Sequence, residues 1–224
     1  MTARARRGLT AAALLVLASC SSADSGSTDY EQFYQLLKQS LSTSFRKVRV
    51  TRDQAASIPY ASMGYSLDEG NQMLLVLATD SGGELLWTGP SHAVIATRDG
   101  RIVRTVGMGH DLANLTMRNG TAPAPAAAVK GAFSTTRLED FPDLGIYGAQ
   151  VSCRAHLVGQ QRINILGQAV TANRVDETCQ SHQTDWSFVD TYWVDPDNGV
   201  VWRSRQHIHP KGGEIETELF RPPG

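Results

Sequence analysis

Alternating apolar and polar positions dominate the C-terminal third of the chain. This period of two, rich in aromatic and β-branched side chains, predicts antiparallel strands. The strands are expected at residues 186–194, 200–209 and 214–220, joined by turns at 195–199 and 210–213. A four-residue second turn would place His209 opposite Glu214, His207 opposite Glu216 and Arg205 opposite Glu218. Polar pairs would then line one face of the last hairpin.

Further strands are expected in the middle of the chain. Residues 45–50, 84–87 and 93–97 are candidate strands, and residues 71–78 form a continuous apolar run that is short enough for a buried strand. Asp99-Gly100 is the strongest turn signal, because both residues tolerate the positive φ of a two-residue hairpin. Pairing Arg98 with Arg101 across this turn would place Ala96 opposite Val103 and Val94 opposite Thr105. The chain is therefore predicted to be mainly β, with a central antiparallel meander.

One helix is predicted near the N-terminus. Thr28 and Glu31 match a capping box, and the apolar residues behind them follow helical spacing: Tyr30, Phe33, Tyr34, Leu37 and Leu41. We expect this helix to pack onto the β-rich body. The Pro/Ala-rich stretch 120–130 is interpreted as a long loop within a single domain of residues 29–222.

The first 20 residues have the order of a bacterial lipoprotein signal. Three arginines precede an apolar run at residues 8–18. The run ends in small residues that are followed by Cys20. The run is much shorter than the ~20 residues that a membrane-spanning helix needs. We therefore predict that residues 1–19 are removed, that Cys20 carries a lipid and that residues 20–28 form a flexible tether. The alternatives are a buried N-terminal helix and a secreted chain that is cut before Cys20 but not lipidated.

Charge argues against nucleic acid as a partner. The chain has 21 basic and 22 acidic side chains, and three of the arginines lie in the expected signal. The remainder is therefore net acidic, whereas phosphate binding needs a basic surface.

Two cysteines, Cys153 and Cys179, remain after the signal. Cys153 lies on the apolar face of an alternating segment, and an oxidising compartment would let the pair form a disulfide. Such a bond would contribute about 3.5 kcal/mol in the chain-entropy model. Two buried free thiols and a metal site are the alternatives, although two distant cysteines without a CxxC motif make a poor zinc site.

Candidate catalytic groups are few. His207 and His209 share one strand face, which suits a metal, but the charge pairing described above explains them without one. The acids Glu214, Glu216 and Glu218 form an exposed-looking row, Asp195 and Asp197 sit in a turn, and no Gly-x-Ser-x-Gly elbow is present. No metal, cofactor or catalytic residue is therefore predicted. Exposed tryptophans can stack on sugar rings, so Trp87 and Trp193 are the candidate ligand surface.

Four short segments of the sequence, taken together, resemble a known family. These segments are residues 53–63, Leu86-Trp87, residues 97–107 and residues 193–196. With the lipoprotein signal, they make the chain similar to the YjbF/GfcB family of group 4 capsule polysaccharide lipoproteins over residues 30–221. The resemblance implies a strongly curved, largely antiparallel sheet or open barrel-like sandwich with few helices. It also implies a role in exopolysaccharide or capsule secretion beside partner proteins.

The expected function is that of a non-enzymatic accessory lipoprotein. It would be held by lipid on the periplasmic face of the outer membrane and would bind export or assembly proteins, the polysaccharide, or both. Ser21 supports this membrane, because an aspartate after Cys20 would favour the inner one. One alternative is a lipid or lipoprotein carrier, with residues 73–77 lining an apolar cavity. The other is an enzyme that modifies polysaccharide.

Overall fold

A single antiparallel sheet organises the described part of the chain. The computed structural model describes residues 48–90, 92–120 and 123–224. Its twelve strands are β1 (Ser62–Leu67), β2 (Met73–Ser81), β3 (Glu84–Thr88), β4 (Val94–Arg98), β5 (Arg101–Val106), β6 (Asn114–Met117), β7 (Phe133–Phe141), β8 (Ile146–Ile165), β9 (Gln168–Ser181), β10 (Ser187–Val194), β11 (Val201–His207) and β12 (Glu214–Arg221). The predicted signal, Cys20, the tether and the helix at residues 28–41 lie outside the described residues.

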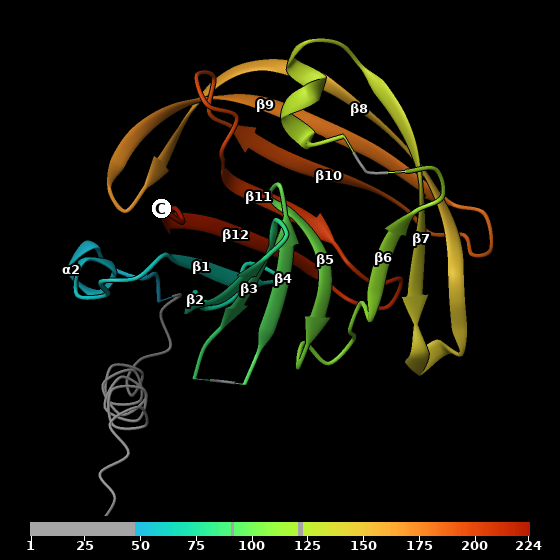
Figure 1. Cartoon of the computed structure of the whole chain (residues 1–224), viewed down its shortest axis with the longest axis horizontal. Coiled ribbons are helices and arrows are strands. Elements are labelled where there is room, and N and C mark those ends of the chain that lie inside the picture. Colours follow the sequence, from blue (N-terminus) through green and yellow to red (C-terminus); the bar gives the residue numbers. More distant parts are fainter. Residues whose placement is uncertain (1–47, 91, 121–122) are drawn as a thin grey trace, which may run out of the picture. The chain divides into compact units, whose positions relative to one another are not determined.

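The sheet curves so strongly that it almost closes into a barrel. The order is β5-β4-β3-β2-β1-β12-β11-β10-β9-β8-β7-β6, so the two edge strands are consecutive in the chain. They meet at their connecting loop, where the Thr105 N–H donates to the Leu112 carbonyl at 2.8 Å. Figure 1 shows the resulting curvature, with β7–β9 arching away from β3–β5. The predicted mainly β, strongly curved antiparallel fold is confirmed.

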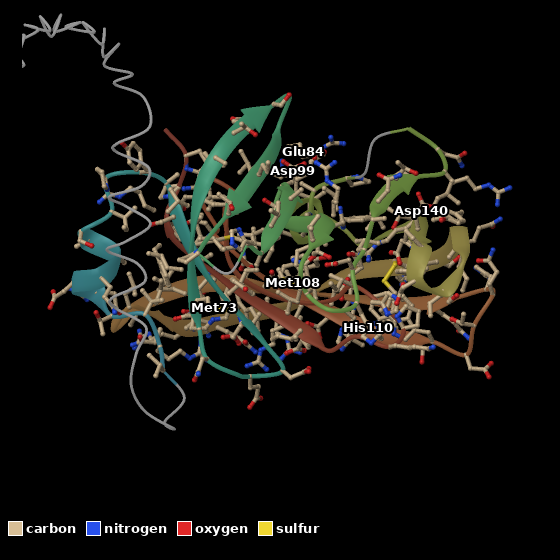
Figure 2. The ribbon with its side chains drawn as sticks, turned by 90° about the horizontal axis from the view of Figure 1, so that it is seen from below. Met73, Glu84, Asp99, Met108, His110 and Asp140 are labelled. Carbon is tan, nitrogen blue, oxygen red and sulfur yellow. A yellow bond between two sulfur atoms is a disulfide. The ribbon has the colours of Figure 1, made fainter. Side chains whose placement is uncertain are left out.

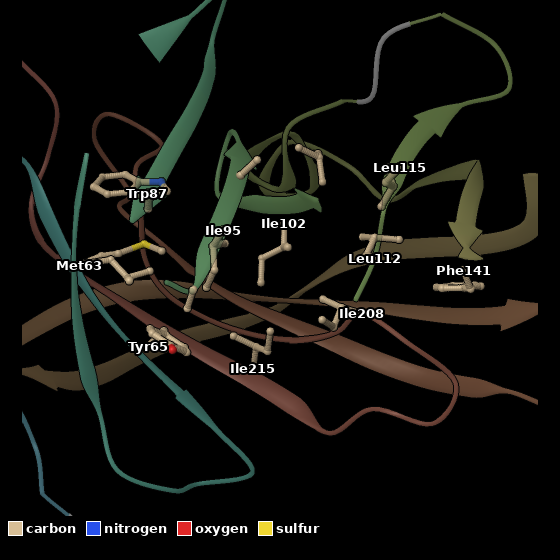
Figure 3. Close-up of a cluster of buried hydrophobic side chains, with 14 of the residues drawn as sticks. Met63, Tyr65, Trp87, Ile95, Ile102, Leu112, Leu115, Phe141, Ile208 and Ile215 are labelled. Carbon is tan, nitrogen blue, oxygen red and sulfur yellow. The ribbon is translucent and has the colours of Figure 1, made fainter. Parts of the chain in front are cut away.

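The core lies between the two halves of this bent sheet. Inward-facing residues from distant strands form one cluster, drawn in Figure 3, that includes Met63, Leu75, Ile95, Ile102, Phe141 and Ile215. Fully burying such a side chain stabilises the fold by about 1.5–3 kcal/mol. Gln206 ties the halves together, since its Oε1 accepts from the Ile102 N–H at 2.8 Å and its Nε2 donates to the Gly100 carbonyl at 2.9 Å.

Three short helical turns complete the described structure: α2 (Arg52–Ala56), η1 (Pro125–Val129) and η2 (Pro142–Leu144). The strand predicted at residues 45–50 is wrong for residues 48–50. The N–H groups of Val48 and Val50 donate to the side chains of Asn71 and Gln72, both at 3.0 Å. Thr51 then caps α2 through a capping box with Gln54. Side-chain oxygens thus accept the hydrogen bonds of these backbone N–H groups, which the backbone of a neighbouring strand would otherwise accept.

The three C-terminal strands are confirmed, but their predicted register is wrong by two residues. Glu214 faces His207, Glu216 faces Arg205 and Glu218 faces Arg203. The strand β11 ends at His207 because His209 turns inward and is only 1% exposed. Its ring contacts Asp143 and the Lys211 N–H, which lengthens the turn and shifts every pair.

The hairpin at Asp99-Gly100 is confirmed, and Arg98 faces Arg101 as predicted. The pairing further from the turn is wrong, because a β-bulge shifts the register between Ala96 and Thr97. Ala96 therefore faces Arg104, and Val94 faces Val106. One extra residue on β5 accounts for this change of partners.

Candidate functional site

The two tryptophans proposed as a ligand surface are buried. Trp87 is 1% exposed and points into the core cluster beside Met63 in Figure 3, and its Nε1–H donates to Thr97 at 2.9 Å. Trp193 is 8% exposed and donates to Gln161 at 2.9 Å. Neither ring offers an open face, so the structure does not support sugar stacking at these residues.

The predicted disulfide is present. Cys153 and Cys179 lie directly opposite each other on β8 and β9 and are bonded. They are buried beside Val151 and Phe188. The bond therefore links β8 and β9 near the open end of their long hairpin, far from its turn at residues 166–167.

The row of glutamates on β12 is not the exposed row that the sequence suggests. Glu216 and Glu218 are each 5% exposed. Arg49 and Arg205 bind the Glu216 carboxylate at 2.8 and 2.9 Å, and Gln72 donates to Glu218 at 2.8 Å. Burial raises the pKa of Glu216, but its arginine partners outweigh burial and the net pKa is lowered. Glu216 and Glu218 are therefore held in ion pairs, whereas Glu214 is partly exposed, lies 3.7 Å from the Arg205 Nε and has its pKa raised by burial.

A second set of ion pairs lies inside the curve of the sheet. Arg101 and Arg137 both bind Glu177, and Arg137 also binds Asp190 at 3.1 Å. Burial raises the pKa of Glu177, but the two guanidiniums outweigh it and the net pKa is lowered. At Glu139 the effect of burial outweighs the attraction of Arg137, and the pKa of Glu139 rises to about 7. All five groups are at most 2% exposed, and their ion pairs join β5, β7, β9 and β10.

Loops far apart in the sequence bring His110, Asp143 and His209 together. The His110 Nδ1 lies 3.1 Å from one oxygen of Asp143, and the His209 Nε2 lies 3.0 Å from the other. The two rings stack with centroids 4.8 Å apart and an interplanar angle of 13°. Sequence reasoning missed this cluster because no ligand spacing links the three positions.

The geometry of this cluster suits hydrogen bonding better than a metal. A metal lies near the plane of each imidazole that binds it, and two stacked, nearly parallel rings do not share such a point. The Lys211 N–H also donates to the His209 Nδ1 at 3.0 Å. That bond assigns the ring proton to Nε2, which points at Asp143. Burial lowers the pKa of His209, in keeping with a neutral ring that anchors three loops.

Three hollows follow one another along β6, at the seam between the two edge strands. Their volumes are about 700, 200 and 120 Å³. Met117 lines the first and second, whereas Leu115 and Thr116 line the second and third. The shared residues place the three hollows next to one another along β6, and we call them together the β6 groove.

Three consecutive residues on each of β7, β8 and β9 line the wide end of the β6 groove, at positions 134–136, 152–154 and 178–180. Neighbouring residues on a strand point to opposite faces, so Thr135, Cys153 and Cys179 share one face of the sheet and Ser134, Arg154 and Thr178 share the other. The Thr135 Oγ1 is buried and has no hydrogen-bond partner within the described part of the chain. An unsatisfied buried hydroxyl is unusual and calls for an explanation.

The narrow end of the groove is charged. Arg98 and Arg104 share the Glu84 carboxylate at 3.3 and 2.9 Å. Figure 2 shows Glu84 and Asp99 close together at one rim of the strands. Across the three hollows the lining includes four arginines (Arg98, Arg101, Arg104 and Arg154) and two carboxylates (Glu84 and Asp99).

Comparison with known proteins identifies the family. The family model described as group 4 capsule polysaccharide lipoprotein gfcB, YjbF, matches residues 34–220. The chain belongs to this family. This match confirms the resemblance that the four sequence segments indicate.

Relatives of the YjbF/GfcB family from Escherichia coli (strain K12) match at similar levels. The uncharacterized lipoprotein GfcB is 26% identical over 176 residues, which cover 78% of this chain and 82% of GfcB. The uncharacterized lipoprotein YjbF is 26% identical over 178 residues, covering 78% and 81%. The crystal structure of the hypothetical lipoprotein YmcC from the same species superposes with a TM-score of 0.69 at 23% identity. It covers 87% of this chain and 95% of YmcC, and it shows a shared fold.

GfcB, YjbF and YmcC are each named as a lipoprotein. Among the residues that the structure describes, no helix is both long and apolar enough to cross a membrane. The curved sheet is shared with the YmcC structure, and the β6 groove lies along β6, one of its two edge strands.

Proposed function

We propose that this protein is a lipid-anchored, non-enzymatic accessory protein in the assembly or secretion of capsule or exopolysaccharide. The observation that carries the proposal is the family match over residues 34–220, which covers the curved sheet except for Arg221, the last residue of β12. Its place would be the periplasmic face of the outer membrane, where it would meet export or assembly proteins and the polymer itself.

The anchor follows from the chemistry of Cys20. One acyl chain gives only marginal membrane binding, and stable anchoring takes more than one. Lipoprotein modification of a cysteine supplies several chains, and residues 21–27 provide a small, polar tether. Ser21 behind the cysteine favours the outer membrane. The names of GfcB and YjbF as lipoproteins support the same anchor.

The described contacts favour a binding role over the alternatives. Glu216 and Glu218, two of the acids considered for catalysis on β12, are held by arginines. The run at residues 73–77, which a lipid carrier would use to line a cavity, contributes Leu75 to the packed core. Most of the residues that line the wide end of the β6 groove are polar. A surface for polymer or protein accounts for these features better than an apolar cavity or a catalytic centre.

Deleting the gene in the native host tests the proposal. Secreted and cell-associated polysaccharide are then quantified and sized, with complementation by the wild-type gene and by a Cys20→Ser variant. The proposal expects less exported polymer in the deletion strain, recovery with the wild-type gene and poor recovery with Cys20→Ser. Unchanged polymer amount and length in the deletion strain would refute the function.

A further inference from the structure

We infer that the body docks on the membrane through one rim of its sheet, where Arg52 and Arg221 bind anionic phospholipid headgroups and Tyr60 lies at the lipid interface. We call this surface the anchor rim: residues 48–60, the β8–β9 turn at Leu166 and the end of β12 at Arg221. The inference rests on the lipid anchor of the proposed function and adds which side of the body meets the membrane.

Hydrogen bonds gather three segments at the anchor rim. The Arg52 Nη2 donates to the Leu166 carbonyl at 3.1 Å, and the Arg221 Nη1 donates to the Pro59 carbonyl at 3.1 Å. Arg221 also pairs with Ser62, the first residue of β1. The registers of β8 to β12 place the β8–β9 turn and the end of β12 at the same end of the sheet. Figure 1 shows α2 and the C-terminus at that end, so both guanidiniums are held on backbone at one rim.

The charges of Arg52 and Arg221 are not neutralised by a described carboxylate. Both residues are exposed, and among the described residues their partners are backbone carbonyls. The other arginine of the segment before β1, Arg49, pairs with Glu216 at 2.8 Å. Asp53 is the one acid in that described segment. Positive charge therefore remains for an anionic partner, and a guanidinium binds a phosphate through two parallel hydrogen bonds.

Basic residues continue from the anchor rim toward Cys20. Residues 46–52 hold four basic side chains and no acid. Each basic side chain at an anionic lipid surface strengthens binding by about fivefold. Residues 21–47 connect Val48 to the predicted lipid, so this rim is where the tether enters the described body. The membrane that holds the lipid is therefore the anionic surface tied to these arginines.

Tyr60 and Val48 expose apolar surface on the same segment. Tyr60 is 59% exposed and Val48 is 37% exposed. Tyrosine favours the boundary between lipid and water, because its ring is apolar and its hydroxyl is polar. Arginines beside an exposed tyrosine thus match a phospholipid surface, which presents phosphate groups above an apolar layer. An acidic polysaccharide presents negative charge without that layer.

Fluorescence quenching in vesicles tests the inference. The lipidated full chain is purified in detergent and reconstituted into phosphatidylcholine vesicles, with or without phosphatidylglycerol, that contain a lipid with a nitroxide on its headgroup. A fluorophore is attached at Ala56→Cys on α2 or at Ser187→Cys, where β10 begins at the opposite rim. Both positions are exposed, and Cys153 and Cys179 are bonded to each other, so the introduced thiol is the one that reacts.

A docked body places α2 near the headgroups, whereas a body that moves freely on its tether brings both labels to them equally. We expect stronger quenching at position 56 than at position 187 when phosphatidylglycerol is present. The difference should shrink without phosphatidylglycerol, and also when salt screens the charges of the unchanged protein.

Paired arginine variants separate charge from folding. Arg52→Gln combined with Arg221→Gln should lower the ratio of docked to free protein about thirtyfold and remove the difference between the labels. The matched control is Arg118→Gln combined with Arg154→Gln. Both control residues are exposed and have no carboxylate partner among the described residues, and their loss should leave the quenching unchanged.

A tyrosine pair tests the apolar contact in the same way. Tyr60→Ser should lose part of the quenching at position 56. Tyr147→Ser should keep it, because Tyr147 is 68% exposed near the start of β8, at the opposite rim. Both side chains are more than half exposed, so neither change should shift the thermal unfolding temperature by more than about 2 °C.

The outcomes separate this inference from the proposed function. A protein that incorporates into vesicles but shows equal quenching at positions 56 and 187 would overturn the inference and leave the anchor standing. Quenching that survives loss of Arg52 and Arg221 would also overturn it, as would shielding of position 56 by the host's polysaccharide but not by vesicles. A protein that does not incorporate at all would refute the anchor, and the inference with it.

Discussion

Replacing Glu139 by glutamine is expected to stabilise the protein above neutral pH and to change its stability little in mild acid. Glu139 lies in the buried network on β7, where its nearest cation is the Arg137 guanidinium at 3.7 Å. Its Oε2 has no hydrogen-bond partner in the described part of the chain. Glu177 and Asp190 take the closer contacts with Arg137. The Glu139 charge is therefore buried with little compensation.

The sign and size of the effect follow from its pKa. Burial raises the pKa of Glu139 from an ordinary 4.5 to about 7. Between these values the folded protein keeps a proton that the unfolded chain has released, so the free energy of unfolding falls as pH rises. At about 1.4 kcal/mol per pH unit, the full loss is about 3 kcal/mol and is reached just above pH 7. Glutamine cannot ionise and escapes this loss.

Urea unfolding of the wild type and Glu139→Gln at pH 5 and pH 8 measures the difference. We expect the variant to be more stable by about 3 kcal/mol at pH 8 and by less than about 1 kcal/mol at pH 5. Glu177→Gln is the control with opposite sign, because the arginines lower the pKa of Glu177. That variant should be less stable than the wild type at pH 8. A Glu139→Gln variant with the same difference at both pH values would refute the reasoning.

Two further changes test the described contacts. Replacing both Cys153 and Cys179 by alanine removes a crosslink between residues 26 apart in the sequence, and should lower the free energy of unfolding by about 3.5 kcal/mol in urea; a loss below about 1 kcal/mol would contradict this. Arg205→Glu should be destabilising, and a double-mutant cycle with Glu216→Arg should recover about 0.5–1 kcal/mol, because the Arg205 Nε lies 2.9 Å from Glu216. Recovery by Glu218→Arg instead would restore the register expected from the sequence.

The strands could be predicted from the sequence because their period of two records burial on one face. Residues 186–194 and 214–220 show this pattern, and the structure places strands there. The register could not be predicted, because it depends on where β11 ends. His209 leaves the strand to meet Asp143 from a distant turn, and no local pattern contains that contact.

The candidate site was much less predictable. Asp143 and His110 have no spacing that links them to His209. The residues that line the wide end of the β6 groove are short consecutive segments of β7, β8 and β9 that look like ordinary strand residues in the sequence. Only the pairing of these three strands brings the segments side by side. The tryptophans misled the prediction because a large aromatic residue on a strand is as compatible with the core as with a ligand surface.

Mass spectrometry of the N-terminal peptide from purified outer membranes tests the central claim most directly. A lipid-anchored accessory protein predicts a peptide that begins at Cys20 and carries several acyl chains, recovered from the outer-membrane fraction. A peptide that begins upstream of Cys20 or carries no lipid, or a protein that remains in the soluble fraction, would contradict the account.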